Sequence, residues 1–270
     1  MAALATLASV ATARTPERIF EAVAPSIVVI NALDAEGKLR AQGSGVTVGK
    51  DEIVTNCHVT EDAKRLVVLH GGRELEASAG VSGVERDLCN VSVPGLAAPV
   101  VGLWRQPLKV GQRVYAIGAP EGLELTISEG LVSSIREFDG SQFIQTSAPI
   151  SSGSSGGGLF DTEGRLVGIT AFFVPEGQNI NFALPVTWIT ELFARGGKPL
   201  PAPQRAAATA KWQARAALLR EKKDGSALLA WAQQWVRSMP TSLAAWLQLG
   251  EAYRTVNRPR RAVSPRTSRR

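Results

Sequence analysis

The sequence predicts a mainly β protein in which two packed β-barrels are followed by a small α-helical region. Short strand patterns separated by Gly-containing turns recur as far as Leu184, about six in each half of this region. After Lys198 the composition changes to a Pro-rich segment and then to an Ala-, Leu- and Trp-rich region of helical periodicity. With 270 residues, 44% of them hydrophobic, the chain can form one large domain and a small one.

The predicted elements begin with a short amphipathic helix at Pro16–Val23. The first series of strands is expected at Ser26–Asn31, Gly43–Val48, Ile53–Asn56, Leu66–His70, Glu74–Ala79, Leu88–Val93 and Val114–Gly118. The second series is expected at Leu125–Glu129, Leu131–Ile135, Phe143–Thr146, Leu166–Phe173 and Ile180–Leu184. Pro185 is then expected to open a helix that runs to Arg195, where Gly196 and Gly197 end it.

The run SAPISSGSSGGGLFD contains a serine, Ser155, between glycines on both sides. This pattern is typical of a backbone that is bent to present a nucleophile. The N–H groups of Gly153 and Ser155 can turn toward one point and form an oxyanion hole, while Gly156 and Gly157 let the chain pass close to a substrate. A Gly/Ser-rich linker would have a similar composition, so the assignment depends on the rest of the chain.

Two upstream segments supply the partners that a nucleophilic serine needs. EIVTNCHV contains His58 and RDLCNVSV contains Asp87, which completes the Ser, His and Asp of an acyl-transfer triad. The local G-x-S-x-G pattern also occurs in α/β-hydrolases, but their histidine follows the serine. Both histidines of this chain, His58 and His70, precede Ser155. The order His58, Asp87, Ser155 is that of chymotrypsin-like proteases.

Four segments carry a resemblance to a known family: QGSGVTVGKDEIVTNCHV, RDLCNVSV, QTSAPISSGSSGGGLFDTEGRLVGI and NINFALPV. In this order they resemble the trypsin-like serine proteases of the HtrA/DegP type, over residues 20–195. The resemblance implies a chymotrypsin-like double β-barrel and a serine endopeptidase that cuts after small aliphatic residues. Ser154 and Gly158 depart from the family's usual Asn and Pro, and Asn90 replaces an apolar residue.

The expected roles follow from these positions. His58 is the general base, Asp87 orients it, and protein or peptide substrates are expected, with no cofactor, no metal and no nucleic acid. The substrate pocket is expected to be lined by Pro149, Ile150, Thr170, Ala171 and Phe172, none of which is acidic. Two alternatives remain open: an inactive protease fold that serves as a peptide-binding scaffold, and an esterase on the same fold.

Two cysteines flank the expected histidine and aspartate. Cys57 precedes His58 directly and Cys89 lies two residues after Asp87. If the two catalytic residues pair, the cysteines are close enough for a disulfide, which would suit an oxidising compartment. Two buried free thiols are the alternative. Neither cysteine belongs to a C-x-x-C pair, so a metal site is not expected, and in an extended chain Cys57 would point away from the site.

The termini bear on localisation. MAALATLASVATA ends in an A-x-A pattern at which a signal peptidase can cut, so residues 1–14 are expected to be a signal peptide or an N-terminal helix. An exported protein, periplasmic or secreted, is favoured over a cytoplasmic one. The net charge of +6 comes from seven arginines in residues 254–270, so the rest of the chain carries 6 − 7 = −1. This pattern indicates a basic tail rather than a nucleic-acid-binding face, and no stretch is apolar enough for a transmembrane helix.

The expected domains are a double-barrel protease domain at 15–198, a linker at 199–206, tetratricopeptide-like helices at 207–262 and a basic tail at 263–270. Trp212 and Trp246 lie 34 residues apart, which is the period of that repeat. The pattern Trp246-x-x-Leu249-Gly250-x-x-Tyr253 fits its first helix, and Ala262 takes the place of the small residue in its second helix. A peptide partner is expected at these helices, and a generic helical hairpin is the alternative.

Overall fold

The computed structural model describes residues 14–61, 63–119, 124–138, 141–151, 153–173, 179–198, 206–238 and 243–257. It contains two compact units. The first unit comprises the described residues up to 137 and those within 142–173 and 177–200, and the second comprises residues 138 and 141 and the described residues beyond 201. Residues 1–13 of the expected signal segment, residues 199–205 of the expected linker, and the tail with Ala262 lie outside the described residues.

The first unit begins with helix α1 (Pro16–Val23), which confirms the predicted bounds. Thr15 caps its first turn by accepting a hydrogen bond from the N–H of Arg18. A short 3-10 turn, η1 (Ala24–Ser26), leads into the first barrel. The strands of this closed barrel follow the spatial order β1 (Ile27–Leu33), β2 (Leu39–Gly49), β3 (Glu52–Thr55), β6 (Leu88–Ser92), β5 (Arg73–Gly83) and β4 (Arg65–His70). Alternate residues of the strands, such as Val28 and Ile30, fill its core.

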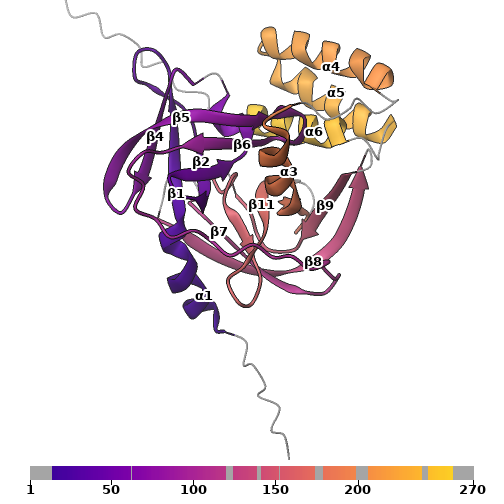
Figure 1. Cartoon of the computed structure of the whole chain (residues 1–270). Helices are drawn as coiled ribbons and strands as arrows, with labels where there is room; N and C mark the ends of the chain where they lie inside the picture. The colour runs from indigo at the N-terminus through magenta and orange to yellow at the C-terminus, as the bar shows by residue number, and fades with distance from the viewer. Residues whose placement is uncertain are drawn as a thin grey trace, which may run out of the picture. The chain divides into compact units, whose positions relative to one another are not determined.

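The second barrel is also closed and lies beside the first in the same unit (Figure 1). Its strands follow the order β10 (Gly158–Phe160), β11 (Leu166–Phe173), β12 (Asn181–Pro185), β9 (Ser141–Thr146), β8 (Thr126–Phe138) and β7 (Arg113–Gly118). Helix α3 (Thr187–Arg195) follows β12 and ends at Gly196 in the left-handed conformation. The expected fold class, two barrels followed by helices, is therefore confirmed.

Several element boundaries differ from the prediction. Val114–Gly118 belongs to the second barrel rather than to the first series, and the short β10 was not predicted. The two strands expected around Gly130 are one strand, β8. Gly130 is not a turn residue: a Cβ atom there would collide with the backbone of Ala148, so the glycine allows a close approach. Pro185 ends β12 instead of opening α3.

Beyond residue 201, the described residues of the second unit form three helices, α4 (Ala206–Glu221), α5 (Gly225–Ser238) and α6 (Leu243–Asn257). Their apolar core includes Leu228, Ala232 and Leu249. The indole of Trp212 lies 4.4 Å from that of Trp231, whose Nε1 donates to the Trp212 carbonyl at 3.1 Å. These tryptophans therefore pack within the helical unit. The tetratricopeptide assignment stays a prediction.

Gly156 marks a close approach between the two barrels. It lies between β9 and β10 with φ 84°, and a Cβ atom there would collide with the Ser44 carbonyl on β2 and with the Thr55 hydroxyl on β3. No larger residue fits without displacing the first barrel. This contact fixes the position of the neighbouring Ser155.

We expect Gly156→Ala to destabilise the protein more than Gly111→Ala. Gly111 has the same backbone conformation, φ 85°, but open space where its Cβ would lie. The control should lose about 1–2 kcal/mol of unfolding free energy from backbone strain. Gly156→Ala should lose about 1–3 kcal/mol more from overpacking. Urea denaturation measures both, and equal losses would contradict the close approach.

Candidate functional site

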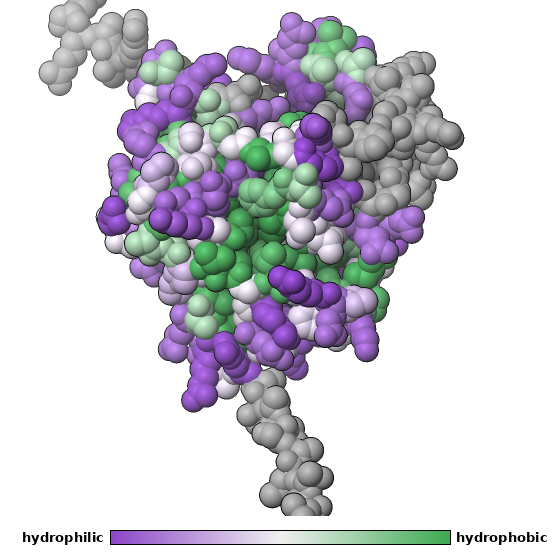
Figure 2. Space-filling view, in the orientation of Figure 1, coloured by the Kyte–Doolittle hydropathy of each residue, from purple (hydrophilic) through white to green (hydrophobic). Residues whose placement is uncertain are grey.

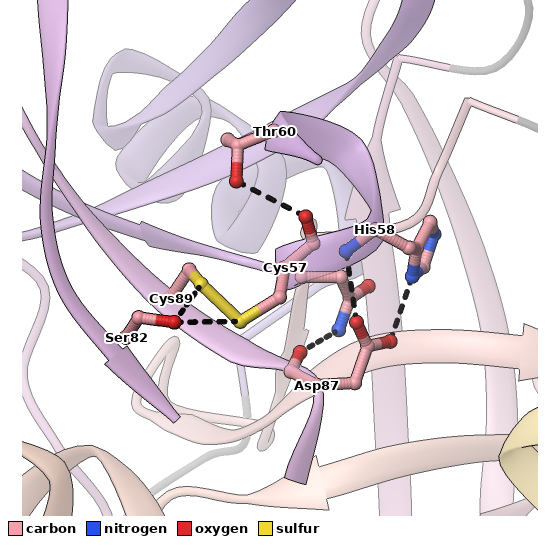
Figure 3. The surroundings of a disulfide bond; sticks show 7 residues. Cys57, His58, Thr60, Ser82, Asp87 and Cys89 are labelled. Carbon is pink, nitrogen blue, oxygen red and sulfur yellow. Dashed lines mark hydrogen bonds and ion pairs between the residues drawn. A yellow bond between two sulfur atoms is a disulfide. The ribbon is translucent and has the colours of Figure 1, made fainter. Parts of the chain in front are cut away.

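His58 and Asp87 form a hydrogen-bonded pair in the first barrel. The Nδ1 of His58 lies 2.7 Å from the Oδ2 of Asp87, and the backbone N–H of His58 donates to Oδ1 at 2.9 Å (Figure 3). The two side chains are 16% and 13% exposed, so the contact is largely shielded from water. Asp87 therefore fixes both the ring and the backbone of His58.

His58 lies on α2 (Cys57–Thr60), a single helical turn that follows β3. The expectation that Cys57 and His58 alternate on an extended chain was therefore wrong: Asn56 is the last extended residue and the chain turns after it. The carboxamide of Asn56 donates to the Asp87 carbonyl at 3.0 Å, and the N–H of Cys57 donates to the same oxygen at 3.2 Å. The start of α2 thus holds the backbone of Asp87.

Asp87 follows the 3-10 turn η2 (Val84–Arg86) and precedes β6. Its backbone is left-handed, with φ 54° and ψ 33°, which is uncommon for a residue other than glycine. Such a conformation persists only where the surrounding structure enforces it. The hydrogen bonds from Asn56 and Cys57 supply part of that enforcement.

A disulfide joins Cys57 to Cys89, with the Cα atoms 4.8 Å apart. Thr55 and Cys89 are partners in the pairing of β3 with β6, so the bridge continues the sheet contact into α2. The hydroxyl of Ser82 on β5 lies 3.3 Å from the sulfur of Cys89 (Figure 3). The bridge links the residue before His58 to the strand that starts after Asp87, so it cross-links the two segments of the pair.

Ser155 lies in the turn between β9 and β10 and is 9% exposed. Its hydroxyl donates to the carbonyl of Ala171 at 3.0 Å, and no hydrogen bond joins it to His58 within the described residues. Its carbonyl accepts from the N–H of Ser44 at 2.8 Å. A Cβ atom at Gly43 would touch both Val59 and the Ser155 carbonyl, so the serine lies close to the turn that carries His58.

The turn around Ser155 leaves two backbone donors free. The N–H groups of Ser154, Gly156 and Gly157 donate to the carbonyls of Ser151, Thr170 and Ser154, respectively. In the described part of the chain, the N–H groups of Gly153 and Ser155 donate to no group. Gly153 has φ 88°, a conformation that favours glycine. Two free donors, one of them on Ser155 itself, match what an oxyanion hole requires.

The residues expected to line a substrate pocket divide into two groups. Pro149 is exposed, whereas Ile150, Thr170, Ala171 and Phe172 are buried. The hydroxyl of Thr170 donates to the Ser154 carbonyl at 2.6 Å. Thr170 therefore supports the turn that carries Ser155.

No role was predicted for Ser44, which the structure places between the barrels. Its hydroxyl donates to the Gly153 carbonyl and accepts from the N–H of Ala119, both at 2.9 Å. Ser44 is fully buried on β2. Of the two glycines beside it, Gly43 was the sequence signal for this close contact, since a Cβ atom there would touch the Ser155 carbonyl.

Asn90, which departs from the family pattern, is accommodated without loss of hydrogen bonding. It is 4% exposed and donates to the Ile53 carbonyl at 3.0 Å and to the carboxylate of Glu52. A Cβ atom at Gly80 would collide with the Asn90 side chain, so the glycine makes room for it. The polar residue therefore fits the strand that follows Asp87.

Comparison with known proteins assigns the barrels to a family. Residues 43–169 match the trypsin-like peptidase domain. A serine endoprotease from Yersinia pestis, solved by crystallography, is 30% identical, with a TM-score of 0.62 over 68% of this chain and 67% of that chain. The chain belongs to the trypsin-like serine peptidases of the DegP type. A probable periplasmic DegP-like serine endoprotease of Halomonas elongata is 36% identical over 157 residues.

The extent of these matches differs between relatives. The DegP-like match covers 54% of this chain but only 33% of the Halomonas protein. The active form of the Rv3671c protease from M. tuberculosis shares the fold, with a TM-score of 0.62 over 74% of this chain and 97% of that chain, at 22% identity. The trypsin-like peptidase fold is thus shared across the barrels, and the DegP-like relatives extend well beyond the matched region.

We expect the double variant Cys57→Ala/Cys89→Ala to fold but to lose about 3–4 kcal/mol of unfolding free energy, because a bridge over 32 residues restricts the unfolded chain. Urea denaturation of the oxidised wild type and the variant measures the difference. Wild type kept in reductant is the control and should approach the variant. Two reactive thiols in denatured protein that was purified under oxidising conditions would contradict the bridge.

Proposed function

We propose that this trypsin-like peptidase is a serine endopeptidase that hydrolyses peptide bonds through His58, Asp87 and Ser155. The observation that carries the proposal is the His58–Asp87 pair beside a serine whose turn leaves two N–H donors free. The names of the DegP-like relatives support the same activity. The histidine, the aspartate and the oxyanion donors each have a role in acyl transfer.

The proposed reaction starts with a rotation of the Ser155 side chain away from the Ala171 carbonyl and toward His58. The Nε2 of His58 takes the hydroxyl proton as the oxygen attacks the peptide carbonyl, and later gives the proton to the leaving amine. The carboxylate of Asp87 on Nδ1 keeps Nε2 free to accept that proton and stabilises the cationic ring. The N–H groups of Gly153 and Ser155 bind the oxyanion, each lowering the barrier by about 2.7–4 kcal/mol.

Water then hydrolyses the acyl-enzyme, and His58 moves the protons as it does in the first half of the reaction. His58 removes a proton from a water molecule, the hydroxide attacks the acyl carbon, and the ester bond to Ser155 breaks. The proton then returns to the serine oxygen. The atoms and protons of the cycle therefore balance with the substrate, the chain's own residues and water.

The residues expected at the substrate pocket favour apolar substrates. Hydrophobic residues gather at the centre of one face of the first unit, where Figure 1 places β7 and β11 (Figure 2). Three of the residues expected at the substrate pocket, Thr170 to Phe172, lie on β11, and none of them is charged. We propose cleavage after small aliphatic residues, as the resemblance implies.

A periplasmic or secreted location is the second part of the proposal. The disulfide requires an oxidising compartment to persist, and the DegP-like relatives are named as periplasmic. No helix in the part of the chain that the structure describes is long and apolar enough to cross a membrane.

An inactive protease fold that binds peptides is the alternative function. The hydrogen bond from the Ser155 hydroxyl to Ala171 favours it, because it directs the nucleophile away from His58. Ser154 and Gly158 also stand where the family usually has Asn and Pro. Covalent labelling of the serine distinguishes the two functions.

We expect Ser155→Ala and His58→Ala each to abolish casein cleavage and labelling by a fluorophosphonate probe. Because the triad acts as a unit, the double variant should be no worse than either single variant. Ser154→Ala is the matched control, since it removes the neighbouring hydroxyl, and it should retain labelling. Labelling of Ser155→Ala at the wild-type rate would refute the assignment of the nucleophile, and unlabelled wild type would favour the scaffold.

We also propose that the helices α4 to α6 select which proteins are cut. The proposed catalytic residues all lie in the first unit, and the helical unit has its own core. Stacked helices of the predicted repeat type offer a groove to peptides.

Truncation after Lys198 should leave turnover of a short aliphatic peptide within severalfold of the wild type and change the cleavage of casein. The physical reason is that the proposed catalytic residues and the disulfide stay in the retained part. Peptide and casein assays on the same preparation measure the two effects. A thermal melt is the control: loss of the cooperative transition would show that the helices are needed for folding and would contradict a separable role.

A further inference from the structure

The residue before Asp87 is an arginine whose side chain is nearly buried. Arg86 is 8% exposed, and its Nε is buried without a hydrogen-bond partner in the described part of the chain. A buried guanidinium costs desolvation free energy, which its partners offset only in part. Such a residue needs an explanation beyond solubility or general stability.

Both partners of Arg86 lie on α3. Its Nη1 donates to the carboxylate of Glu191, and its guanidinium carbon lies 4.4 Å from the centre of the Trp188 ring. Trp188 is 3% exposed and packs edge-on against Phe143 on β9, with 4.8 Å between the ring centres. Arg86 therefore binds a platform that is itself anchored in the second barrel.

Backbone packing brings η2 and α3 together at the same place. A Cβ atom at Gly83, directly before η2, would lie 3.0 Å from the Cδ1 of Leu192 on α3. The helix thus contacts both ends of the short turn that leads into Asp87. This turn must deliver Asp87 in its left-handed conformation, which a free chain would leave.

The contacts of Asp87 with Asn56, Cys57 and His58 hold it from the side of α2. Arg86 holds the same turn from the side of α3. We propose that Arg86 is a positioning residue: by binding Glu191 and Trp188 it keeps the Asp87 carboxylate on the Nδ1 of His58 while the ring is charged. This inference rests on the proposed function of the pair as part of a triad.

The role predicts a larger effect on chemistry than on folding. Removing one member of an ion pair is costly where the remaining charge is buried, but Glu191 is 47% exposed and water can solvate its carboxylate. A small displacement of a catalytic group, by contrast, lowers the rate strongly. Arg86→Met keeps the length of the side chain and its packing on Trp188 but removes the charge. It should lower kcat by about tenfold to a hundredfold and leave KM within about twofold, because the substrate does not contact Arg86.

Arg165 provides a matched control in the second barrel. It pairs with Asp161 and its guanidinium carbon lies 4.5 Å from the centre of the Trp104 ring, so it makes the same two kinds of contact away from the triad. Arg165→Met should leave kcat within about twofold of the wild type. Arg86→Lys, which keeps a charge near Glu191, should recover part of the loss seen in Arg86→Met.

The experiment measures kcat and KM on a short aliphatic peptide. Active sites are counted by titration to completion with the fluorophosphonate probe, and kcat is expressed per titrated site. A merely structural role would lower the number of titrated sites and leave kcat per site unchanged. Unchanged kcat per site in Arg86→Met, or an equal loss in Arg165→Met, would overturn the inference. A separate outcome tests the proposed function: if the probe does not label the wild type at Ser155, the proposed function is wrong, whatever the Arg86 variants show.

If Arg86→Met does not fold, Glu191→Gln tests the same contact from its more exposed end. Its matched control is Glu163→Gln, which removes a comparable surface partner of Arg165. Glu191→Gln should lower kcat per titrated site severalfold, and Glu163→Gln should not. Equal values for these two variants would overturn the role of Arg86.

Discussion

The close approach of the Ser155 turn to strand β2 is the contact on which the rest of the site depends. Ser44 uses its backbone N–H, its hydroxyl and its carbonyl to bind the two barrels and the neighbouring strand β3. Gly156 permits this approach because any side chain there would enter the first barrel. The position of the serine relative to His58 is therefore set by backbone contacts between the barrels, and Ser44 holds the loop that carries the serine at two carbonyls, those of Gly153 and Ser155.

Chemistry and order along the chain predicted the three proposed catalytic residues, because few arrangements of one histidine, one aspartate and a glycine-flanked serine fit acyl transfer. The strands were predictable where β-branched and other apolar residues form a short run between turn residues, as in β1 and β11. Gly130 misled the prediction, since a glycine that admits a neighbouring backbone looks the same in sequence as one that makes a turn. Strand β10 has only three residues and no alternation to detect.

The sequence could not assign the supporting residues Ser44 and Arg86 for a different reason. Ser44 acts on residues 75 and 109 positions away, and Arg86 acts on a residue 105 positions away. The residues next to them in the sequence do not identify these distant partners. A polar residue between two glycines, or a charged residue beside an expected catalytic aspartate, is a hint that only the tertiary structure interprets. The helices after Lys198 present the opposite difficulty. The 34-residue spacing of two tryptophans is visible in the sequence, but a repeat is stable only when it packs against neighbouring repeats, and the spacing alone does not show such packing.

The disulfide and the order of the segments have a consequence for the newly made protein. Cys57 and Cys89 lie early in the chain, so the bridge can close as soon as the first barrel has left the ribosome or the export channel. The serine turn comes later, and α3, which holds the turn before Asp87, comes after both barrels. A partly synthesised chain therefore has the cross-linked His58–Asp87 pair before it has Ser155. The proposed peptidase activity is thus absent from the nascent polypeptide until both barrels are complete.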